Sequence, residues 1–453
     1  MSDFEAVAAR VADRVTPSAA ERERLRAAVD ALTARVHDAI ADLPVDADVV
    51  QVGSTARGTW LADDRDIDLF VRFPATLDRA DLERYGLAVG RAVLPDGHEE
   101  YAEHPYVTGE SRGFDVDLVP CYDVADATAI QSAVDRTPFH DAYLQDRLDD
   151  ALARDVRLFK AFLTGIGAYG SDLRTRGFSG YLSELLVLEY GGFEPLLRAA
   201  ADWHPPVRFD PEGHGTGTGT GTFDDPLVVV DPTDPERNVA AVCSPANVAR
   251  LQHYARDLLA DPREDRFVAS DPAPVDADAV RTHLDRRGTT PVAVVFETPD
   301  IVDDQLYPQL RKSLHGVADE LDRRGFEPLR SATFAADRAV LLVELAVGEL
   351  ASVERHAGPP VHVREHAIGF YDAYADRDVY GPFLDGDRYV VEREREFTTP
   401  AGVLESDALF DVALGAHVET ALDDGYDLLV GDEIAALADD FGVPLARYFE
   451  PTP

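Results

Sequence analysis

Three aspartates in the first third of the chain are spaced so that they could hold metal ions. Asp66 and Asp68 are separated by one residue, and Asp117 follows later in a Val-Asp-Leu-Val-Pro segment. A pair of metal ions held about 3.5–4 Å apart can activate an attacking hydroxyl and stabilise the leaving oxygen when a phosphoryl group is displaced. The layout therefore indicates nucleotidyl transfer.

Strands are the elements that would carry these aspartates. Side chains alternate between the two faces of a strand, so Asp66 and Asp68 share one face while the apolar residues around them face the core. In the last of the strands Asp115 and Asp117 both point to the polar face, and either could complete a carboxylate triad. The three segments that predict these strands are 48–52, 67–73 and 114–119.

The loop between the first two strands makes the chemistry more specific. An Asp-x-Asp pair alone is common at solvated strand ends and is weak evidence for a metal site. Gly53 and Ser54 are small, however, so backbone N–H groups there could approach a triphosphate, and Arg57 adds a charged donor. The loop and the carboxylates together are far more specific than either part.

Further motifs give the chain a resemblance to a known family. Residues 53–61, followed by Asp66-Ile67-Asp68, resemble the head domain of the archaeal (class I) CCA-adding enzymes, which are tRNA nucleotidyltransferases. One departure is that the first metal carboxylate of this family can be Glu where this chain has Asp66. Other segments that look like the same family follow in order along the chain: 116–121, 136–140, 177–184, 231–240 and 299–310.

The resemblance implies a reaction and a set of site residues. The enzyme would add CCA to the 3′ end of tRNA from CTP and ATP without a template, and would release pyrophosphate. Its catalytic carboxylates, which would bind Mg²⁺, are Asp66, Asp68 and Asp117. The residues that would bind the nucleotide are Ser54, Arg57, His140, Lys160, Tyr169 and Arg237. Of these, Arg237 would help to read the incoming base.

Several basic residues also have ordinary structural explanations. Arg237 could instead pair with Asp231 or Asp234. The helix predicted over 146–165 carries a basic face formed by Arg154, Arg157 and Lys160, of which the two arginines could simply be solvated. In the C-terminal half, the candidate phosphate contacts, which could equally line a solvated helix, are Arg311, Lys312, Arg323 and Arg324.

The charge of the chain conflicts with an RNA substrate at ordinary salt concentration. The net charge is −42, and the lysines are Lys160 and Lys312 alone, so arginine supplies the remaining basic charge. Such a surface repels a polyanion. At molar salt the Debye length falls to about 3 Å, which leaves local contacts to decide binding. The composition therefore indicates a halophilic protein rather than one that avoids nucleic acid.

Composition and segment pattern exclude several other classes. Cys121 and Cys243 are too few for a disulfide framework or a zinc site, and both lie beside apolar residues. The N-terminus lacks a basic segment followed by an apolar run, and no apolar stretch approaches the ~20 residues that span a bilayer. We therefore expect a cytoplasmic protein without a membrane contact.

A multidomain α+β fold is expected. The resemblance implies a nucleotidyltransferase (polymerase beta-like) head over 1–145 and a helical middle domain with nucleotide contacts over 146–272. Over 273–453 it implies a C-terminal body and tail that would grip the acceptor and T arms of tRNA. A strand, a long helix and two strands in this last part suggest a ferredoxin-like or RRM-like module: 292–297, 303–324, 332–334 and 340–345.

Three local features complete the prediction. Thr16 could cap the first helix with Pro17 at its first position. A Gly-Thr alternation over 215–222 predicts a flexible loop or a lineage-specific insertion, to which no chemistry is assigned. Residues beyond about 400 predict two further helices.

Three rival functions share parts of this pattern. A poly(A) polymerase or oligoadenylate synthase would have the same head, as would an antibiotic or protein nucleotidyltransferase. A non-catalytic RNA-binding protein with a decayed site is the rival from another class, and the intact carboxylates argue against it. Both a monomer and a homodimer fit the sequence.

The charge leads to a prediction about salt. Self-repulsion among the carboxylates is unscreened at about 0.1 M salt, so we expect the melting temperature to rise steadily toward molar KCl. Thermal unfolding at a series of KCl concentrations measures this. A protein that is most stable near 0.1 M would contradict the halophilic interpretation.

Overall fold

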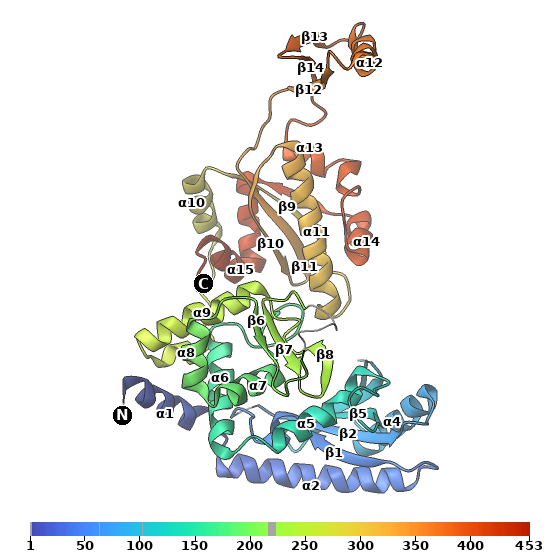
Figure 1. Ribbon diagram of the computed structural model, residues 1–453, viewed down its shortest axis with the longest axis vertical. Coiled ribbons are helices and arrows are strands. Elements are labelled where there is room, and N and C mark those ends of the chain that lie inside the picture. The colour runs from blue at the N-terminus through green and yellow to red at the C-terminus, as the bar shows by residue number, and fades with distance from the viewer. Residues whose placement is uncertain (1, 63, 102, 216–222) are drawn as a thin grey trace. The chain divides into compact units, whose positions relative to one another are not determined.

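The chain divides into two compact units, the first ending at Ser270 and the second beginning at Asp271 (Figure 1). The computed structural model describes residues 2–62, 64–101, 103–215 and 223–453. The Gly-Thr alternation therefore lies, apart from Gly215, outside the described residues. Within the described part, no helix combines the length and the apolar character that crossing a membrane requires.

The first unit begins with a five-stranded sheet that carries the predicted aspartates. The strands β2 and β5 run parallel, and the other neighbours are antiparallel. In sheet order the strands are β1 (Asp48–Val52), β2 (Asp66–Pro74), β5 (Phe114–Asp123), β4 (Pro105–Ser111) and β3 (His98–Tyr101). The helices α2 (Ala19–Ala41) and α4 (Arg79–Val93) bury one face of this sheet through a shared apolar cluster that includes Ile67, Leu69, Val116 and Leu118. The alternation predicted for these strands is confirmed, since Asp66, Asp68, Asp115 and Asp117 lie on the face away from this cluster.

The N-terminal helices differ from the prediction. Helix α1 (Asp3–Val15) was not expected, and Thr16 closes it rather than opening the next helix. The second helix, α2, starts at Ala19 because Ser18 is its N-cap and Glu21 completes a reciprocal capping box. Two side-chain hydrogen bonds at Ser18 outweigh the weaker signal from Thr16 and Pro17.

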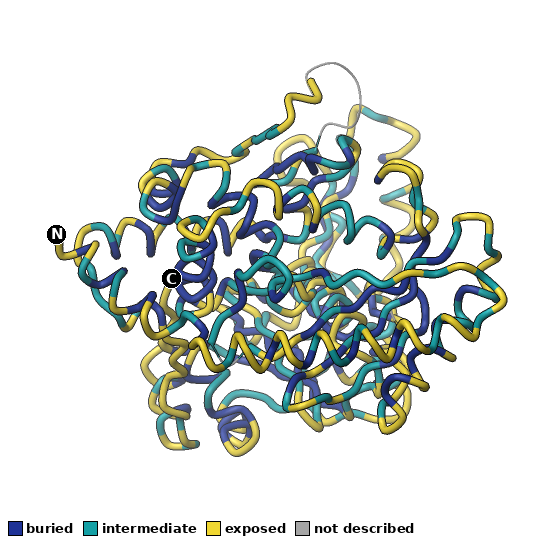
Figure 2. The backbone as a smooth tube through the Cα atoms, turned by 90° about the horizontal axis from the view of Figure 1, so that it is seen from below, coloured by how far each residue is buried: buried dark blue, intermediate teal, exposed yellow. Residues whose placement is uncertain are grey.

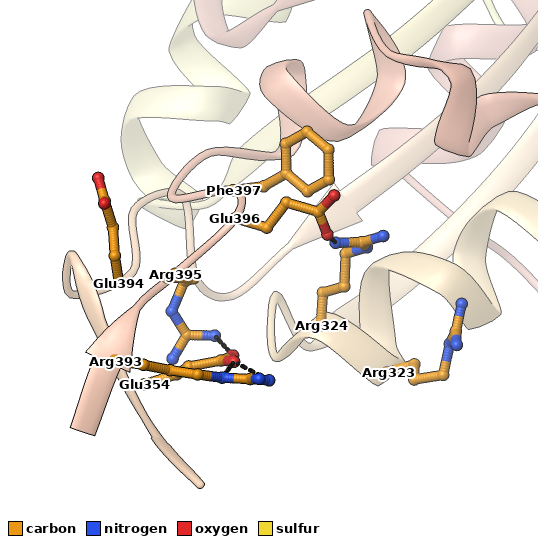
Figure 3. Close-up of a pocket in the computed structure, with 8 residues that line it drawn as sticks. All are labelled: Arg323, Arg324, Glu354, Arg393, Glu394, Arg395, Glu396 and Phe397. Atoms are coloured by element: carbon orange, nitrogen blue, oxygen red, sulfur yellow. Dashed lines mark hydrogen bonds and ion pairs between the residues drawn. The ribbon is translucent and has the colours of Figure 1, made fainter. Parts of the chain in front are cut away.

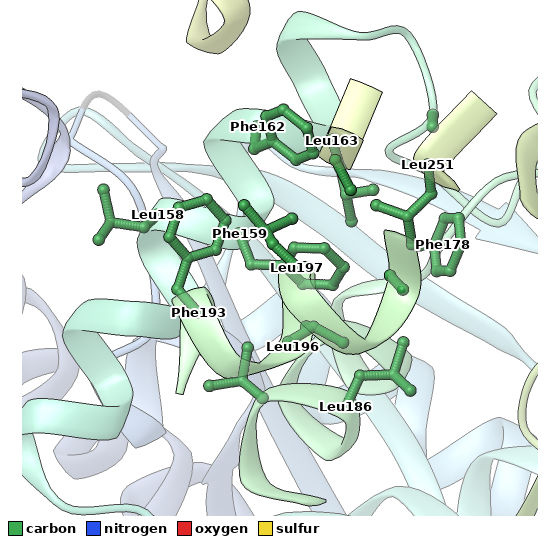
Figure 4. Close-up of a cluster of buried hydrophobic side chains, with 14 of the residues drawn as sticks. Leu158, Phe159, Phe162, Leu163, Phe178, Leu186, Phe193, Leu196, Leu197 and Leu251 are labelled. Carbon is green, nitrogen blue, oxygen red and sulfur yellow. The ribbon is translucent and has the colours of Figure 1, made fainter. Parts of the chain in front are cut away.

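A helical region packs against the sheet and has an aromatic core of its own. The ring centroid of Phe193 lies 6.4 Å from that of Phe159 and 6.0 Å from that of Phe162 (Figure 4). The ring of Phe4 in α1 lies 5.9 Å from the Phe193 ring. Its helices are α3 (Gly53–Arg57), α5 (Thr137–Gln145), α6 (Asp150–Gly165), α7 (Gly180–Tyr190), α8 (Phe193–Ala201) and α9 (Pro245–Ala260), with the 3₁₀ turns η1 (Ala133–Arg136) and η2 (Glu264–Phe267). A small sheet completes it: β6 (Val207–Phe209), β7 (Leu227–Asp231) and β8 (Asp234–Asn238).

Burial follows the amphipathic pattern of these elements. Buried and exposed residues alternate along the coils of the helices (Figure 2). Strand β7 is an exception, because all five of its residues are buried. Cys121 and Cys243 are both free and buried, as expected for core thiols.

The second unit contains a ferredoxin-like sheet, which confirms the predicted C-terminal fold. Its strand order is β10-β11-β9-β15 with every neighbouring pair antiparallel, and helices cover both faces. The strands are β9 (Thr290–Glu297), β10 (Pro328–Ala335), β11 (Arg338–Leu345) and β15 (Asp427–Val430). The helices are α10 (Ala277–Arg287), α11 (Asp303–Arg324), α13 (Pro400–Leu404), α14 (Ala416–Asp424) and α15 (Ala438–Phe449), with the turns η3 (Asp407–Leu409) and η4 (Gly431–Leu437).

The two helices predicted beyond residue 400 are present as α14 and α15, but two further elements of this stretch were not predicted. This stretch holds three α-helices and the edge strand β15, which pairs with β9. The strand is only four residues long and stands between Gly425 and Gly431, so its alternation is too short to reveal it.

A small module is inserted between β11 and α13. It consists of β12 (Val353–Pro360), α12 (Arg364–Tyr374), β13 (Tyr380–Asp385) and β14 (Arg388–Glu394), with β14 in the middle of the sheet. The incoming and outgoing segments run side by side, because the Leu350 N–H donates to the Thr398 carbonyl at 2.8 Å and the Arg395 N–H donates to the Ser352 carbonyl at 2.8 Å.

Candidate active site

The parallel pairing of β2 and β5 brings the predicted catalytic carboxylates together. In the register of these strands Asp66 stands opposite Asp115, and Asp68 stands opposite Asp117. Thr108 of β4 is paired with Asp117 on its other side and donates a hydrogen bond to that carboxylate. Four carboxylates thus share the open face of the sheet.

Burial and mutual repulsion raise the pKa values of these carboxylates. Burial raises the pKa of Asp68 to about 7, with the charges of Asp117 and Asp66 adding to the effect. Burial also raises the pKa of Asp66 to about 6, helped by Asp64, and raises that of Asp117. A divalent cation would reverse these shifts, and carboxylate oxygens are the ligands that Mg²⁺ prefers. Among the described residues, however, no group of three or more His, Cys, Asp or Glu side chains is gathered closely enough to enclose an ion. The fit to a metal therefore rests on residue type, register and charge.

Gly53 allows the loop after β1 to approach Asp68. Its φ is +83°, and a Cβ at this position would lie 2.2 Å from the Asp68 Oδ2. A larger residue would therefore collide with the carboxylate as well as strain the backbone. Ser54 follows in the short helix α3, and its carbonyl accepts from the Thr59 N–H at 3.0 Å. The loop predicted to bind phosphate thus lies against the predicted metal ligands.

Glu184 of α7 joins two of the predicted nucleotide contacts. Its Oε2 accepts from Arg57 at 2.8 Å and 3.1 Å, and its Oε1 lies 3.4 Å from the Lys160 Nζ and also accepts from the Thr59 hydroxyl. Glu184 is fully buried and Lys160 is 2% exposed. Asp141 of α5 accepts from the remaining terminal nitrogen of Arg57. One buried network therefore holds Arg57 and Lys160 together.

Charge pairing decides the protonation of this network. Burial alone would raise the pKa of Glu184, but Lys160, Arg57 and the Thr59 hydroxyl outweigh it, and the pKa is lowered. Burial lowers the pKa of Lys160 although Glu184 opposes the shift. Tyr169 lies close by, since a Cβ at Gly180 would be 3.3 Å from its hydroxyl and 3.6 Å from the Lys160 Nζ. Ser54, Arg57, Lys160 and Tyr169 thus line one region.

Asp231 joins the other two predicted contacts. Its Oδ2 lies 2.7 Å from the His140 Nε2 and accepts from an Arg237 terminal nitrogen at 2.8 Å. The ring of Tyr181 stacks on His140 with centroids 4.0 Å apart. Neighbouring residues of α5 reach both groups, because Asp141 binds Arg57 while His140 binds Asp231. Helix α5 therefore connects the two ends of the site.

The structure also shows the contacts of the arginines for which the sequence left alternatives open. Arg237 does pair with Asp231, but its side chain keeps 36% of its surface exposed. Arg157 does not lie on a solvated face: it is 8% exposed, and it donates to the Gly58 carbonyl. Arg154, with 42% of its side chain exposed, does face solvent.

Sequence reasoning missed the carboxylates that hold the site together. Glu184 and Asp141 were not predicted to have a role, and Asp231 was considered only as a possible partner of Arg237, not of His140. One signal for Glu184 was present, because it is the single charge in the apolar run Leu182–Leu188, and a lone carboxylate inside such a run must be paired when the helix is buried.

A second concave feature lies within the C-terminal unit. It is a cavity of about 510 Å³ lined by four arginines, three glutamates and Phe397 (Figure 3). The Arg324 guanidinium lies 4.5 Å from the centre of the Phe397 ring and bonds to Glu396 at 3.0 Å. Two of the predicted phosphate contacts, Arg323 and Arg324, line it, whereas Arg311 and Lys312 do not.

Family models match three regions of the chain in order. The model of the nucleotidyltransferase domain matches 34–140, that of the second domain of tRNA nucleotidyltransferase matches 154–268, and that of the C-terminal domain of CCA-adding enzyme matches 287–431. The CCA-adding enzyme of Haloarcula marismortui is 63% identical over 470 residues, which cover all of both chains. This chain belongs to the CCA-adding enzyme family.

Other members of the family support the same assignment. The CCA-adding enzyme of Halorubrum lacusprofundi is 65% identical over 467 residues, covering all of both chains. That of Methanosarcina mazei is 40% identical over 447 residues, covering 97% of each chain. The resemblance inferred from the motifs is confirmed, and the chain is a nucleotidyltransferase that adds CCA to tRNA.

The raised pKa values lead to a prediction about Mg²⁺ and pH. Protonated Asp66 and Asp68 stabilise the metal-free fold at low pH, and this contribution is lost as the pH rises through about 6 to about 7. Mg²⁺ binds the ionised form, so at constant ionic strength it should raise the melting temperature more at a pH of about 8 than at about 5.5. Asp68→Asn serves as the control and should lose most of the gain. An equal gain at both pH values would contradict the metal role.

Proposed function

We propose that CCA addition by this chain takes place at Asp66, Asp68 and Asp117, with Mg²⁺ as the metal and CTP and ATP as the nucleotides. The observation that carries the proposal is the strand register, which sets Asp68 opposite Asp117 on an open face. Gly53 beside Asp68 then leaves room for the loop that would hold the triphosphate. When bound, the metal ions would lower the pKa of the RNA 3′-hydroxyl and screen the charge on the phosphates.

The phosphate end of the site has donors to spare for a triphosphate. Arg57 uses Nε and one N–H on each terminal nitrogen for Glu184 and Asp141, so each terminal nitrogen keeps a second N–H. Lys160 adds a charge, and Ser54 and Tyr169 add hydroxyl groups. Because Glu184 and Asp141 hold Arg57, and Glu184 holds Lys160, before the nucleotide binds, these side chains have little conformational freedom left to lose on binding.

The base end of the site must choose C and A without a template. Arg237 is the proposed reader, because it is partly exposed while Asp231 holds one of its terminal nitrogens. A site that offers hydrogen bonds to one base edge rejects a base that leaves its groups unpaired. CTP and ATP would therefore be selected by their Watson–Crick edges.

The tRNA body is proposed to contact the C-terminal unit. The arginine cavity fits RNA phosphates, since arginine recognises phosphate through paired N–H groups. Each of its arginines also pairs with a glutamate, for example Arg393 with Glu354 at 2.6 Å. At molar salt such exposed pairs are weak and leave the guanidinium groups free to exchange partners. The acceptor and T arms are the proposed RNA elements.

Incorporation on a truncated tRNA tests the proposal. Purified protein receives tRNA that lacks its 3′ CCA, with Mg²⁺ and labelled CTP or ATP in molar KCl. We expect C residues to be added to this tRNA and A to be added once the two C residues are present. A long A tail with ATP alone, as a poly(A) polymerase would make, or no incorporation of either nucleotide would contradict the proposal.

A pair of variants on one strand tests the carboxylate assignment. Asp117→Asn should lower incorporation of CTP and ATP alike by more than about 100-fold, since even residues that only support metal ligands cost about 10–100-fold. Asp115→Asn is the matched control on the same face of β5 and should lower it by less than about tenfold. Affinity for tRNA should stay within a few-fold in both. Equal losses in the two variants would contradict the assignment of Asp117.

A further inference from the structure

Asp231 accepts hydrogen bonds both from its own turn and from two side chains outside that turn. The side chain is fully buried. Its Oδ1 accepts from the Thr233 N–H at 2.9 Å and from the Thr233 hydroxyl at 2.8 Å. Its Oδ2 then faces the other way and meets both His140 and Arg237. The turn between β7 and β8 thus fixes the carboxylate, and the carboxylate fixes two side chains of the site.

The charge states make these contacts directional. Burial lowers the pKa of His140, and although burial alone would raise the pKa of Asp231, its hydrogen bonds and the neighbouring His140 lower it. Asp231 is therefore an anion, and the His140 Nε2 donates to it. Tyr181 stacks on the other side of the imidazole, and its buried hydroxyl has no hydrogen-bond partner among the described residues. The ring of His140 is thus held on its face and at its edge.

We infer that Asp231 is a positioning residue that sets base selectivity through Arg237. An arginine side chain has many rotamers, and a guanidinium held at one terminal nitrogen presents its other N–H groups in a defined plane. Freed from Asp231, Arg237 could meet donors and acceptors in several orientations and would discriminate less among bases. The inference rests on the proposed role of Arg237 as base reader.

The neighbouring carboxylate of Asp234 is arranged differently. It belongs to the same hairpin and pairs with Arg136 at 2.9 Å, but neither oxygen bonds to His140 or Arg237. Asp231 and Asp234 are thus alike in residue type, hairpin and arginine pairing, and they differ in contact with the proposed nucleotide-binding residues. Asp234 is therefore a matched control.

The test is the pattern of nucleotide preference. The ratio of kcat/KM for CTP over UTP and for ATP over GTP is measured on tRNAs ending before and within CCA, for Asp231→Asn, Asp234→Asn and Arg237→Ala. Asp231→Asn should narrow both ratios by about tenfold or more, the scale of a lost charged hydrogen bond. Asp234→Asn should leave the ratios within about twofold, whatever it does to the overall rate, because its contacts do not reach the base reader.

Each other outcome overturns a defined part. If Asp231→Asn lowers kcat/KM by the same factor for all four nucleotides, the residue is structural and the inference is wrong. If Arg237→Ala changes the ratios but Asp231→Asn does not, the inference fails while the proposed function stands. If Arg237→Ala leaves them unchanged, the base-reading role fails and the inference fails with it. Should Asp231→Asn not fold, Thr233→Ala removes one hydrogen bond to Oδ1 and should narrow the ratios in the same direction, and unchanged ratios there would also overturn the inference.

Discussion

The active region depends on one negative charge that is sealed inside the protein. Glu184 lies on α7, yet it holds Arg57 and Thr59 from the loop beside the sheet and Lys160 from α6. Removing one partner from a buried ion pair typically costs about 3–5 kcal/mol because a charge is left without compensation. The sheet with its carboxylates and the helices with their cations are therefore held in one arrangement, so the charges of the proposed nucleotide site are in place before any nucleotide binds.

The placement of the charged residues explains how so acidic a chain can act on tRNA and nucleoside triphosphates, which are both anionic. Most of its carboxylates face solvent, where molar salt screens them over about 3 Å. The cations proposed to bind the nucleotide are instead each held by a carboxylate: Glu184 for Lys160, Asp141 for Arg57 and Asp231 for Arg237. Lys160 and Arg57 are buried as well. Lys160, one of the two lysines of the chain, is thus buried in the interior, where screening by salt is weakest.

Local patterns in the sequence were sufficient for the parts of the fold that depend on neighbours along the chain. Alternation placed Asp66 and Asp68 on one face of β2, and helix periodicity found α6 and α11. Contacts between residues far apart in the sequence could not be predicted from these local patterns. Examples are the close approach of Gly53 to Asp68 and the hydrogen bonds of Asp231 to both His140 and Arg237. The start of α2 was misplaced because two capping signals competed, and β15 was missed because four residues carry too little pattern.

The inserted module of β12 to β14 shows how such a chain can grow. Its two connecting segments are hydrogen-bonded to each other, between Leu350 and Thr398 and between Ser352 and Arg395. The entropic cost of closing the chain between these segments depends only weakly on the length of the inserted module. Each doubling of that length costs only about 0.6 kcal/mol. Evolution could therefore lengthen, shorten or exchange this inserted module without disturbing the sheet that carries it.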